Sequence, residues 1–126
     1  MAIAATYAMG GGVRGYKHPS IDDVAPEHIF QALSDPVRID IVRRLAAVPQ
    51  ASCAALTGDR PKSSMSHHFR VLRDAGLVRT RIEGTAHANE LRRAELDRRF
   101  PGLIDALLDA IQANGGGGAP DPVRGA

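Results

Sequence analysis

Residues 61–91 read PKSSMSHHFRVLRDAGLVRTRIEGTAHANEL, and this stretch decides the fold because its two halves have different periodicities. The first half has apolar residues at the three- and four-residue spacing of one helix face, namely Met65, Phe69, Leu72 and Ala75. Gly76 then stands where a left-handed cap would end the helix. The second half alternates apolar and charged residues from Val78 to Ile82, as a half-exposed strand does. We therefore predict a helix followed by a strand.

The opposite face of the predicted helix carries short hydrogen-bonding side chains and one cation, namely Ser63, Ser66, His67 and Arg70. Side chains of these types can reach base edges and phosphates. An ordinary solvated face would also be polar, so the helix alone does not decide between the two interpretations. His68 borders the apolar stripe, and we expect it to make a structural hydrogen bond.

The charge distribution favours the nucleic-acid interpretation. The whole chain has 16 basic and 14 acidic residues, which leaves a net charge of only +2. Between residues 60 and 82, one acid, Asp74, stands among the basic residues Arg60, Lys62, Arg70, Arg73, Arg79 and Arg81. Such a local concentration of positive charge is an electrostatic footprint for phosphate.

The predicted strand continues into a hairpin, because residues 83–85 read EGT, which is typical of a turn, and residues 86–91 return as a second strand. Arg79 and Arg81 lie on one face of this hairpin, where they could contact the DNA backbone. A helix with a polar face followed by a basic hairpin predicts a mainly α fold with a small β-hairpin, the winged helix-turn-helix.

One small domain accounts for most of the chain. Its 126 residues are 44% hydrophobic, and no stretch approaches the length that spans a membrane. We expect the domain at residues 21–114, with flexible glycine-containing tails at residues 1–20 and 115–126. The short apolar start has no basic residue before its apolar run, so we expect a cytoplasmic protein. A single cysteine fits a chain that does not depend on disulfides.

Three further helices are predicted before residue 61 and one after the hairpin. The first runs from Pro26 to Leu33, and its proline suits a first helical turn. Asp35 and Ser52 are typical N-caps of the next two helices, the first of which has Pro36 at its first position. The last helix is expected at residues 101–114, which gives the order α-α-α-α-β-β-α.

The last predicted helix has a nearly continuous apolar stripe, formed by Leu103, Ile104, Leu107, Leu108 and Ile111. Its remaining surface is thinly charged, with only Asp105 and Asp109. A helix this apolar either folds onto its own domain or pairs with a second copy of the chain.

The chain resembles the ArsR/SmtB family of dimeric winged-helix transcriptional repressors over roughly residues 24–112. Three segments carry the resemblance: FQALSDPVRIDIVRRLA at 30–46, SSMSHHFRVLRDAGLV at 63–78 and RIEGT at 81–85. They are similar to the family's first-to-second helix junction, its recognition helix and its wing. The resemblance implies a sequence-specific transcriptional regulator, a repressor that binds an inverted-repeat operator in double-stranded DNA as a homodimer.

Two sets of site residues follow from the resemblance and the residue pattern together. The recognition helix and wing would contact DNA through Lys62, Ser63, Ser64, Ser66, His67, Arg70, Arg79 and Arg81. The first and last helices would form the dimer interface through Phe30, Leu103, Leu107, Leu108 and Ile111. Two-fold symmetry would then place the recognition helices roughly 34 Å apart, one turn of DNA.

The metal sites best known in the family are incomplete in this chain. Where the family's third-helix site has a Cys-X-Cys pair, residues 52–55 read SCAA and supply one thiolate. The family's site on the last helix needs histidine, and residues 95–114 contain none. We therefore predict no metal and no cofactor, and leave open a non-standard site built from Cys53, His28 and His18. The sequence does not identify the effector.

Cys53 has two interpretations, a small buried hydrophobic residue or a sensor thiol whose oxidation or alkylation releases DNA. Two alternatives come from other functional classes. Neighbours on one helix such as Ser66, His67 and His68 do not provide the geometry of a catalytic triad, so we expect no enzyme activity. A winged helix used only for protein binding would show no salt-sensitive affinity for DNA.

Overall fold

The computed structural model describes residues 15–114. Its elements follow in the order η2 (Ile21–Asp23), α2 (Pro26–Ala32), α3 (Pro36–Ala47), β1 (Ala51–Ser52), α4 (Cys53–Thr57), α5 (Lys62–Asp74), β2 (Val78–Glu83), β3 (Ala86–Leu91), α6 (Arg93–Arg99) and α7 (Leu103–Ala113).

Two predicted N-caps are confirmed. The Asp35 carboxylate accepts hydrogen bonds from the amides of Val37 and Arg38, at 2.8 and 3.3 Å, at the start of α3. The Ser52 hydroxyl oxygen accepts from the amide of Ala55 at 3.0 Å at the start of α4. These short polar side chains satisfy amides that lack partners within the helix, and so they set its first residue.

The junction between α5 and the hairpin depends on Gly76. Its φ of +86° lies in the left-handed region, and its amide donates to the carbonyl of Arg73 at 3.0 Å. The amide of Leu77 donates to the carbonyl of Leu72 at 3.1 Å, which completes a Schellman motif. The chain therefore turns sharply at the predicted cap and enters β2 two residues later.

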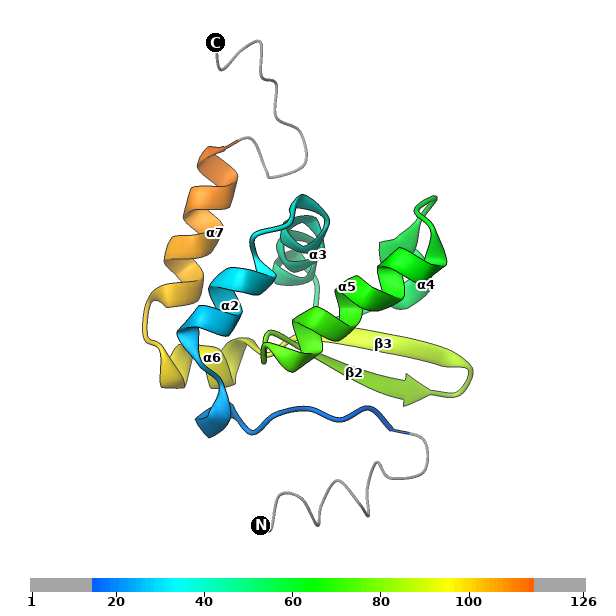
Figure 1. Ribbon diagram of the computed structural model, residues 1–126, viewed down its shortest axis with the longest axis horizontal. Helices are drawn as coiled ribbons and strands as arrows, with labels where there is room; N and C mark the ends of the chain where they lie inside the picture. The colour runs from blue at the N-terminus through cyan, green and yellow to red at the C-terminus, as the bar shows by residue number, and fades with distance from the viewer. Residues whose placement is uncertain (1–14, 115–126) are drawn as a thin grey trace.

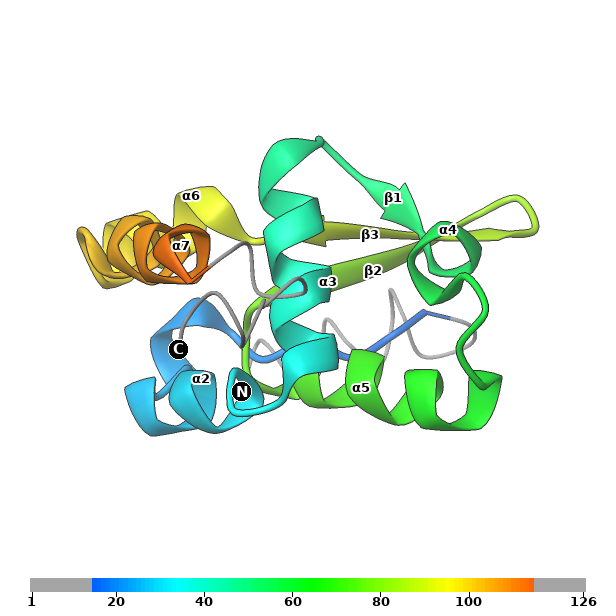
Figure 2. The ribbon, with the colours of Figure 1, turned by 90° about the horizontal axis from the view of Figure 1, so that it is seen from above.

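One hydrophobic core joins helices α2 to α7. The helices each contribute at least one fully buried side chain, and among these are Ile29, Ile41, Leu56, Met65, Leu72, Leu96 and Ile104. Helix α3 lies at the centre, with α7 on one side of it and α4 on the other (Figures 1 and 2). No helix within residues 15–114 is both long and apolar enough to cross a membrane.

The sheet is antiparallel with the strand order β1-β3-β2, so the predicted hairpin has a third short strand beside it. A buried pair of polar side chains holds the strands together: the Thr80 hydroxyl donates to Asn89 Oδ1 at 2.6 Å. Asn89 Nδ2 in turn donates to the carbonyl of Ala51 at 3.3 Å and to Cys53 Sγ at 3.2 Å. Asn89 thus connects the hairpin to β1 and to the start of α4.

The structure differs from the predicted element order at α6. This helix was not predicted because it follows β3 almost directly, buries only Leu96 and has no side-chain N-cap hydrogen bond. Strand β1 was missed because two residues carry no periodicity. The predicted last helix is therefore shorter, since Pro101 and Gly102 separate α7 from α6.

A second difference concerns residues 15–20, which the sequence assigned to a flexible tail. The structure places these residues alongside β2 (Figure 1), where the imidazole of His18 accepts a hydrogen bond from the amide of Thr80. The ordered domain therefore begins before residue 21. The rest of both predicted tails, residues 1–14 and 115–126, lies outside the described residues.

Candidate nucleic-acid interface

Helix α5 is amphipathic in the way the sequence predicted. Met65, Phe69 and Leu72 are buried, with 1%, 4% and 0% of their surface exposed. All predicted DNA-contacting residues of this helix are exposed on its other side: Lys62, Ser63, Ser64, Ser66, His67 and Arg70. The buried stripe fixes the rotation of α5 about its own axis, and this rotation presents the polar side chains to solvent.

An ion-pair cluster anchors the turn that leads into α5. The Asp40 carboxylate, on α3 and only 8% exposed as a residue, lies 3.4 Å from Arg60 in that turn. Arg43 and Arg44 approach the same carboxylate at 2.5 and 3.9 Å. Asp40 was not among the predicted site residues, although an acid beside the apolar pair Ile41 and Val42 is a usable signal for a paired buried charge.

His68 has the structural role that its position predicted. Its Nδ1 lies 3.0 Å from Arg38 Nη1, and Arg38 Nε donates to the carbonyl of Ala32 at 2.7 Å. Burial lowers the pKa of His68, which favours the neutral imidazole that can accept from a guanidinium. The contact connects α5 to α3 and the end of α2. Its neighbour His67 is exposed on the polar face.

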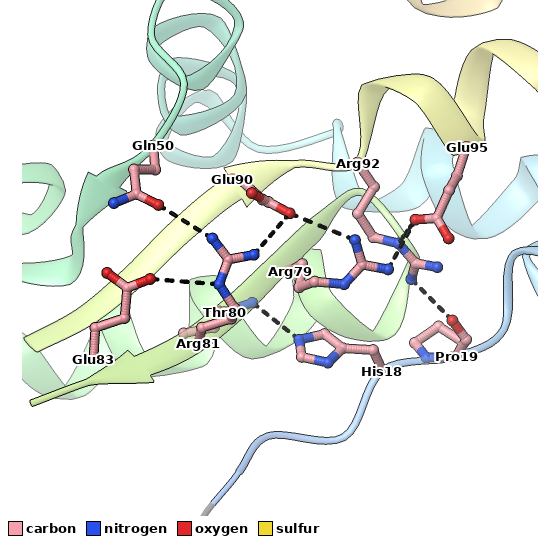
Figure 3. A network of polar contacts seen from close by, with 10 residues as sticks. All are labelled: His18, Pro19, Gln50, Arg79, Thr80, Arg81, Glu83, Glu90, Arg92 and Glu95. Carbon is pink, nitrogen blue, oxygen red and sulfur yellow. Dashed lines mark hydrogen bonds and ion pairs between the residues drawn. The ribbon is translucent and has the colours of Figure 1, made fainter. Parts of the chain in front are cut away.

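The two arginines of the wing, the hairpin of β2 and β3, are held by acidic side chains (Figure 3). Arg79 lies 2.8 Å from Glu95 and 3.5 Å from Glu90. Arg81 lies 3.1 Å from Glu90 and 3.5 Å from Glu83, and it also donates to Gln50 at 3.2 Å. The partners follow the basic stretch in the sequence, so counting charges up to residue 82 overestimated the free positive charge of the wing.

The cations of the predicted cluster therefore fall into two groups. Arg60, Arg79 and Arg81 have carboxylate partners, and the Arg73 guanidinium lies over the ring of Tyr16, 4.2 Å from its centroid. Among the residues that the structure describes, Lys62 and Arg70 have no carboxylate within ion-pairing distance. Arg73 also lacks a carboxylate partner there, so the cations of this cluster without an ion pair among residues 15–114 are all on α5, and the exposed ones, Lys62 and Arg70, lie on the same helix as its serines and His67.

Comparisons with known proteins agree with this arrangement. Residues 33–81, from the end of α2 into β2, match the family described as a helix-turn-helix domain. The chain is 33% identical over 89 residues to an HTH-type transcriptional regulator of Bacillus subtilis, an alignment that covers 68% of this chain and 89% of that protein. The chain belongs to the ArsR family of helix-turn-helix transcriptional regulators.

Two further relatives support this membership. The arsenical resistance operon repressor of Staphylococcus xylosus is 33% identical over 87 residues, which are 68% of this chain and 79% of that protein. The crystal structure of an ArsR family transcriptional regulator superposes with a TM-score of 0.53 at 27% identity, covering 69% of this chain and 91% of that one. This ArsR-family chain is therefore a DNA-binding transcriptional regulator with the winged-helix fold.

The candidate sensor residues of this ArsR-family regulator lie apart. Cys53 is half-buried at the start of α4, where Asn89 Nδ2 donates to its sulfur, whereas His28 is exposed on α2 and His18 lies against β2. Within residues 15–114, no three or more histidine, cysteine or acidic side chains are grouped to hold a metal ion. The non-standard site of Cys53, His28 and His18 is therefore not formed in the structure.

Helix α7 packs largely onto its own domain. Ile104 is buried, and Leu103, Leu107 and Leu108 lie partly buried against the core. A groove of about 420 Å³ remains beside α7, lined by Leu33, Ser34, Pro36, Ile39, Leu107, Ala110, Ile111 and Asn114. Phe30 on α2 is also 52% exposed. The apolar stripe of α7 thus packs onto its own domain, which is one of its two predicted roles. The groove and Phe30 remain as an apolar surface open to solvent.

Proposed function

We propose that this regulator represses transcription by binding an inverted-repeat operator as a homodimer, with the polar face of α5 in the major groove. The observation that carries the proposal is the division of α5 into a buried stripe and an exposed polar face, which carries two exposed cations without a carboxylate partner among residues 15–114, Lys62 and Arg70. A helix of this kind fits the major groove, where base edges present a distinct pattern for each base pair.

The side chains of α5 divide between two tasks. Arg70 lies in the interior of the helix, and a guanidinium there can donate two hydrogen bonds to the O6 and N7 atoms of a guanine. Ser63, Ser66 and His67 can contact neighbouring bases or phosphates, whereas Lys62 at the first residue of α5 suits a backbone phosphate. Base contacts would give specificity and phosphate contacts would fix the register.

A second copy of the chain is the occupant we propose for the apolar groove beside α7. One short helix makes few contacts, and a two-fold dimer doubles them on a symmetric site. The groove and the exposed Phe30 belong to α7, α2 and the start of α3, on the side of α3 away from α4. A dimer through this surface leaves the polar face of α5 uncovered.

DNA affinity, measured by fluorescence anisotropy on the region upstream of the regulator's own gene, tests this function. Arg70→Ala should weaken specific binding by about 1–3 kcal/mol, roughly 5- to 150-fold. Arg98→Ala is the matched control, because Arg98 is exposed on α6 and has no ion-pair partner among residues 15–114. Equal affinities for the wild type and Arg70→Ala would contradict the assignment of α5.

The homodimer has a separate test in sedimentation equilibrium. Leu107→Asp places a charge at the groove and should give monomers at micromolar concentration, with DNA affinity lost along with the dimer. Leu107→Met keeps the side chain apolar and should leave the dimer intact. A wild-type chain that sediments as a monomer at this concentration would refute the dimer, while the anisotropy result would still test the DNA contacts.

A further inference from the structure

The segment of residues 15–20 lies between the two parts of the molecule that would touch DNA. The ring of Tyr16 lies under the guanidinium of Arg73 on α5, with 4.2 Å between the guanidinium carbon and the ring centroid. The hydroxyl of the same tyrosine lies 2.5 Å from Nδ1 of His87 on β3. One side chain therefore contacts both the recognition helix and the wing.

His18 supplies a second attachment, to the other strand of the wing. Strand β2 is at the edge of the sheet, and His18 Nε2 accepts a hydrogen bond from the amide of Thr80 at 3.0 Å (Figure 3). Burial, and next the positive charge of Arg79, lower the pKa of His18 to about 4. The imidazole is therefore neutral near pH 7 and keeps the lone pair that accepts from the Thr80 amide.

A third attachment holds the end of the segment beneath the base of the wing. Arg92, only 3% exposed, donates through Nη1 to the carbonyl of Pro19 at 2.9 Å and through Nε to Glu95 at 2.8 Å. Glu95 also binds Arg79 on β2, and the hydrogen bond from Arg92, with that from Arg79, lowers the pKa of Glu95 to about 2. The segment is thus joined to α5, both long strands and the start of α6.

The hairpin has little other support at its outer end. Strand β1 is two residues long and pairs only with Asn89 and Ala88 of β3, so the remainder of the hairpin is two-stranded. An isolated two-stranded hairpin is marginally stable in water. Without the segment, the amide of Thr80 would face solvent, and the wing would be held relative to α5 by the junction at Gly76 and by the contacts of Asn89 with β1 and Cys53.

We propose that residues 15–20 are a brace that holds the wing at a fixed position relative to the recognition helix, with Tyr16 and His18 as positioning residues for DNA binding. This inference rests on the proposed function, because it assumes that the wing approaches DNA together with α5. The brace acts through the wing and contributes to affinity by keeping the hairpin ordered before DNA arrives.

The first test measures hydrogen exchange of the wing amides, which needs no DNA. Tyr16→Phe keeps the ring over Arg73 and removes the hydroxyl that contacts His87, and His18→Ala removes the acceptor for Thr80. Both variants should speed exchange of β2 and β3 amides, by about tenfold for Thr80, and leave α3 unchanged. Lys17→Ala, an exposed neighbour between the two, should exchange as the wild type does. Unchanged wing exchange in both variants would overturn the brace.

The second test is a double-mutant cycle on DNA affinity. Arg81→Ala in the wing should cost several-fold in the wild type and much less in Tyr16→Phe, because a displaced wing no longer delivers Arg81 to phosphate. If Tyr16 only fills space, Tyr16→Phe should bind DNA with wild-type affinity, and Arg81→Ala should cost the same in Tyr16→Phe as in the wild type. This result would contradict the brace. If Arg81→Ala has no effect in the wild type, the proposed wing contact fails, and the exchange measurement still decides the brace.

Discussion

The recognition helix and the wing both carry arginines, yet the structure treats their charges differently. Arg70 on α5 is exposed and has no carboxylate partner among residues 15–114, whereas Arg79 and Arg81 on β2 each lie within 3.5 Å of two carboxylates. A phosphate can attract Arg70 directly, but it must compete with Glu90 for Arg81. Charge near a DNA-binding element is therefore available to phosphate only after the element's internal ion pairs are subtracted.

The largest expected effect comes from breaking the junction that joins the two regions. Gly76→Ala places a Cβ 2.2 Å from Cγ2 of the buried Val24 and forces alanine to a φ of +86°. We expect a loss of unfolding free energy on the order of 2 kcal/mol or more, from the left-handed backbone and the overpacking together. Urea unfolding measures this loss.

Gly84→Ala is the matched control for the junction. Its φ of +66° is also left-handed, but a Cβ there meets nothing within 4 Å, so only the backbone strain of about 1 kcal/mol remains. In a Val24→Ala background, the loss of unfolding free energy caused by Gly76→Ala should become closer to the loss caused by Gly84→Ala. Identical unfolding midpoints for Gly76→Ala and Gly84→Ala would mean that the contact with Val24 relaxes at no cost.

The next effect should come from releasing the wing's cations. Glu90→Gln removes the carboxylate that Arg79 and Arg81 share, so the wing gains positive charge and two less restrained arginines. DNA affinity should rise by up to about fivefold, under about 1 kcal/mol, and the slope of log affinity against log salt should steepen by about one unit. Asp97→Asn, which loosens Arg93 on α6 instead, is the control. An unchanged slope in Glu90→Gln would leave the wing without phosphate contacts.

Lowering the pH should destabilise the fold through His18 and Glu95 beside the wing, and the loss of stability should be small near neutral pH. The pKa of His18 is lowered to about 4 from 6.5, so its contribution to stability is present above pH 6.5 and is lost as the pH falls toward 4. The pKa of Glu95 is lowered to about 2 from 4.5, so its contribution is lost between pH 4.5 and 2. Thermal unfolding midpoints should therefore fall with pH, and His18→Ala should make the fall between pH 6.5 and 4 shallower.

The smallest effect is expected from transition metals. Cys53 contacts Asn89 and belongs to no group of three metal-ligating side chains within residues 15–114. We therefore expect zinc, cadmium, nickel and trivalent arsenic to change operator affinity by less than about twofold, in the wild type and in Cys53→Ser alike. A loss of tenfold or more, about 1.4 kcal/mol of coupling, that disappears in Cys53→Ser would return Cys53 to the role of a sensor.

Features set by neighbouring residues could be predicted from the sequence. Asp35, Ser52 and Gly76 act within a few residues of their own positions, and the prediction of each as a cap is confirmed. The stripe of Met65 and Phe69 repeats at helical spacing, and its burial is confirmed as well. The order of the two strands and the turn between them follow from the same local signals.

Features that join distant parts of the chain could not be predicted in this way. The bond between His18 and Thr80 spans 62 positions and that between Pro19 and Arg92 spans 73, so no local pattern reports them. The ion pair of Arg79 with Glu90 depends on strand register, which places the two residues opposite each other. The roles of the α5 side chains in DNA recognition stay predictions, because the structure gives their exposure and not their contacts with bases.

The role of Arg70 in base recognition is tested by the affinities for operator DNA in which one base pair at a time is replaced. The wild type should lose about 1–3 kcal/mol of binding free energy when one particular guanine in each half-site is replaced, and the two guanines should lie at positions related by two-fold symmetry. Arg70→Ala should bind with nearly equal affinity whichever base pair stands at that position, and it should keep the wild-type base preferences at the other positions. If Arg70→Ala retains the full base preference at every position of the operator, Arg70 does not read a base and α5 is not the recognition helix proposed above.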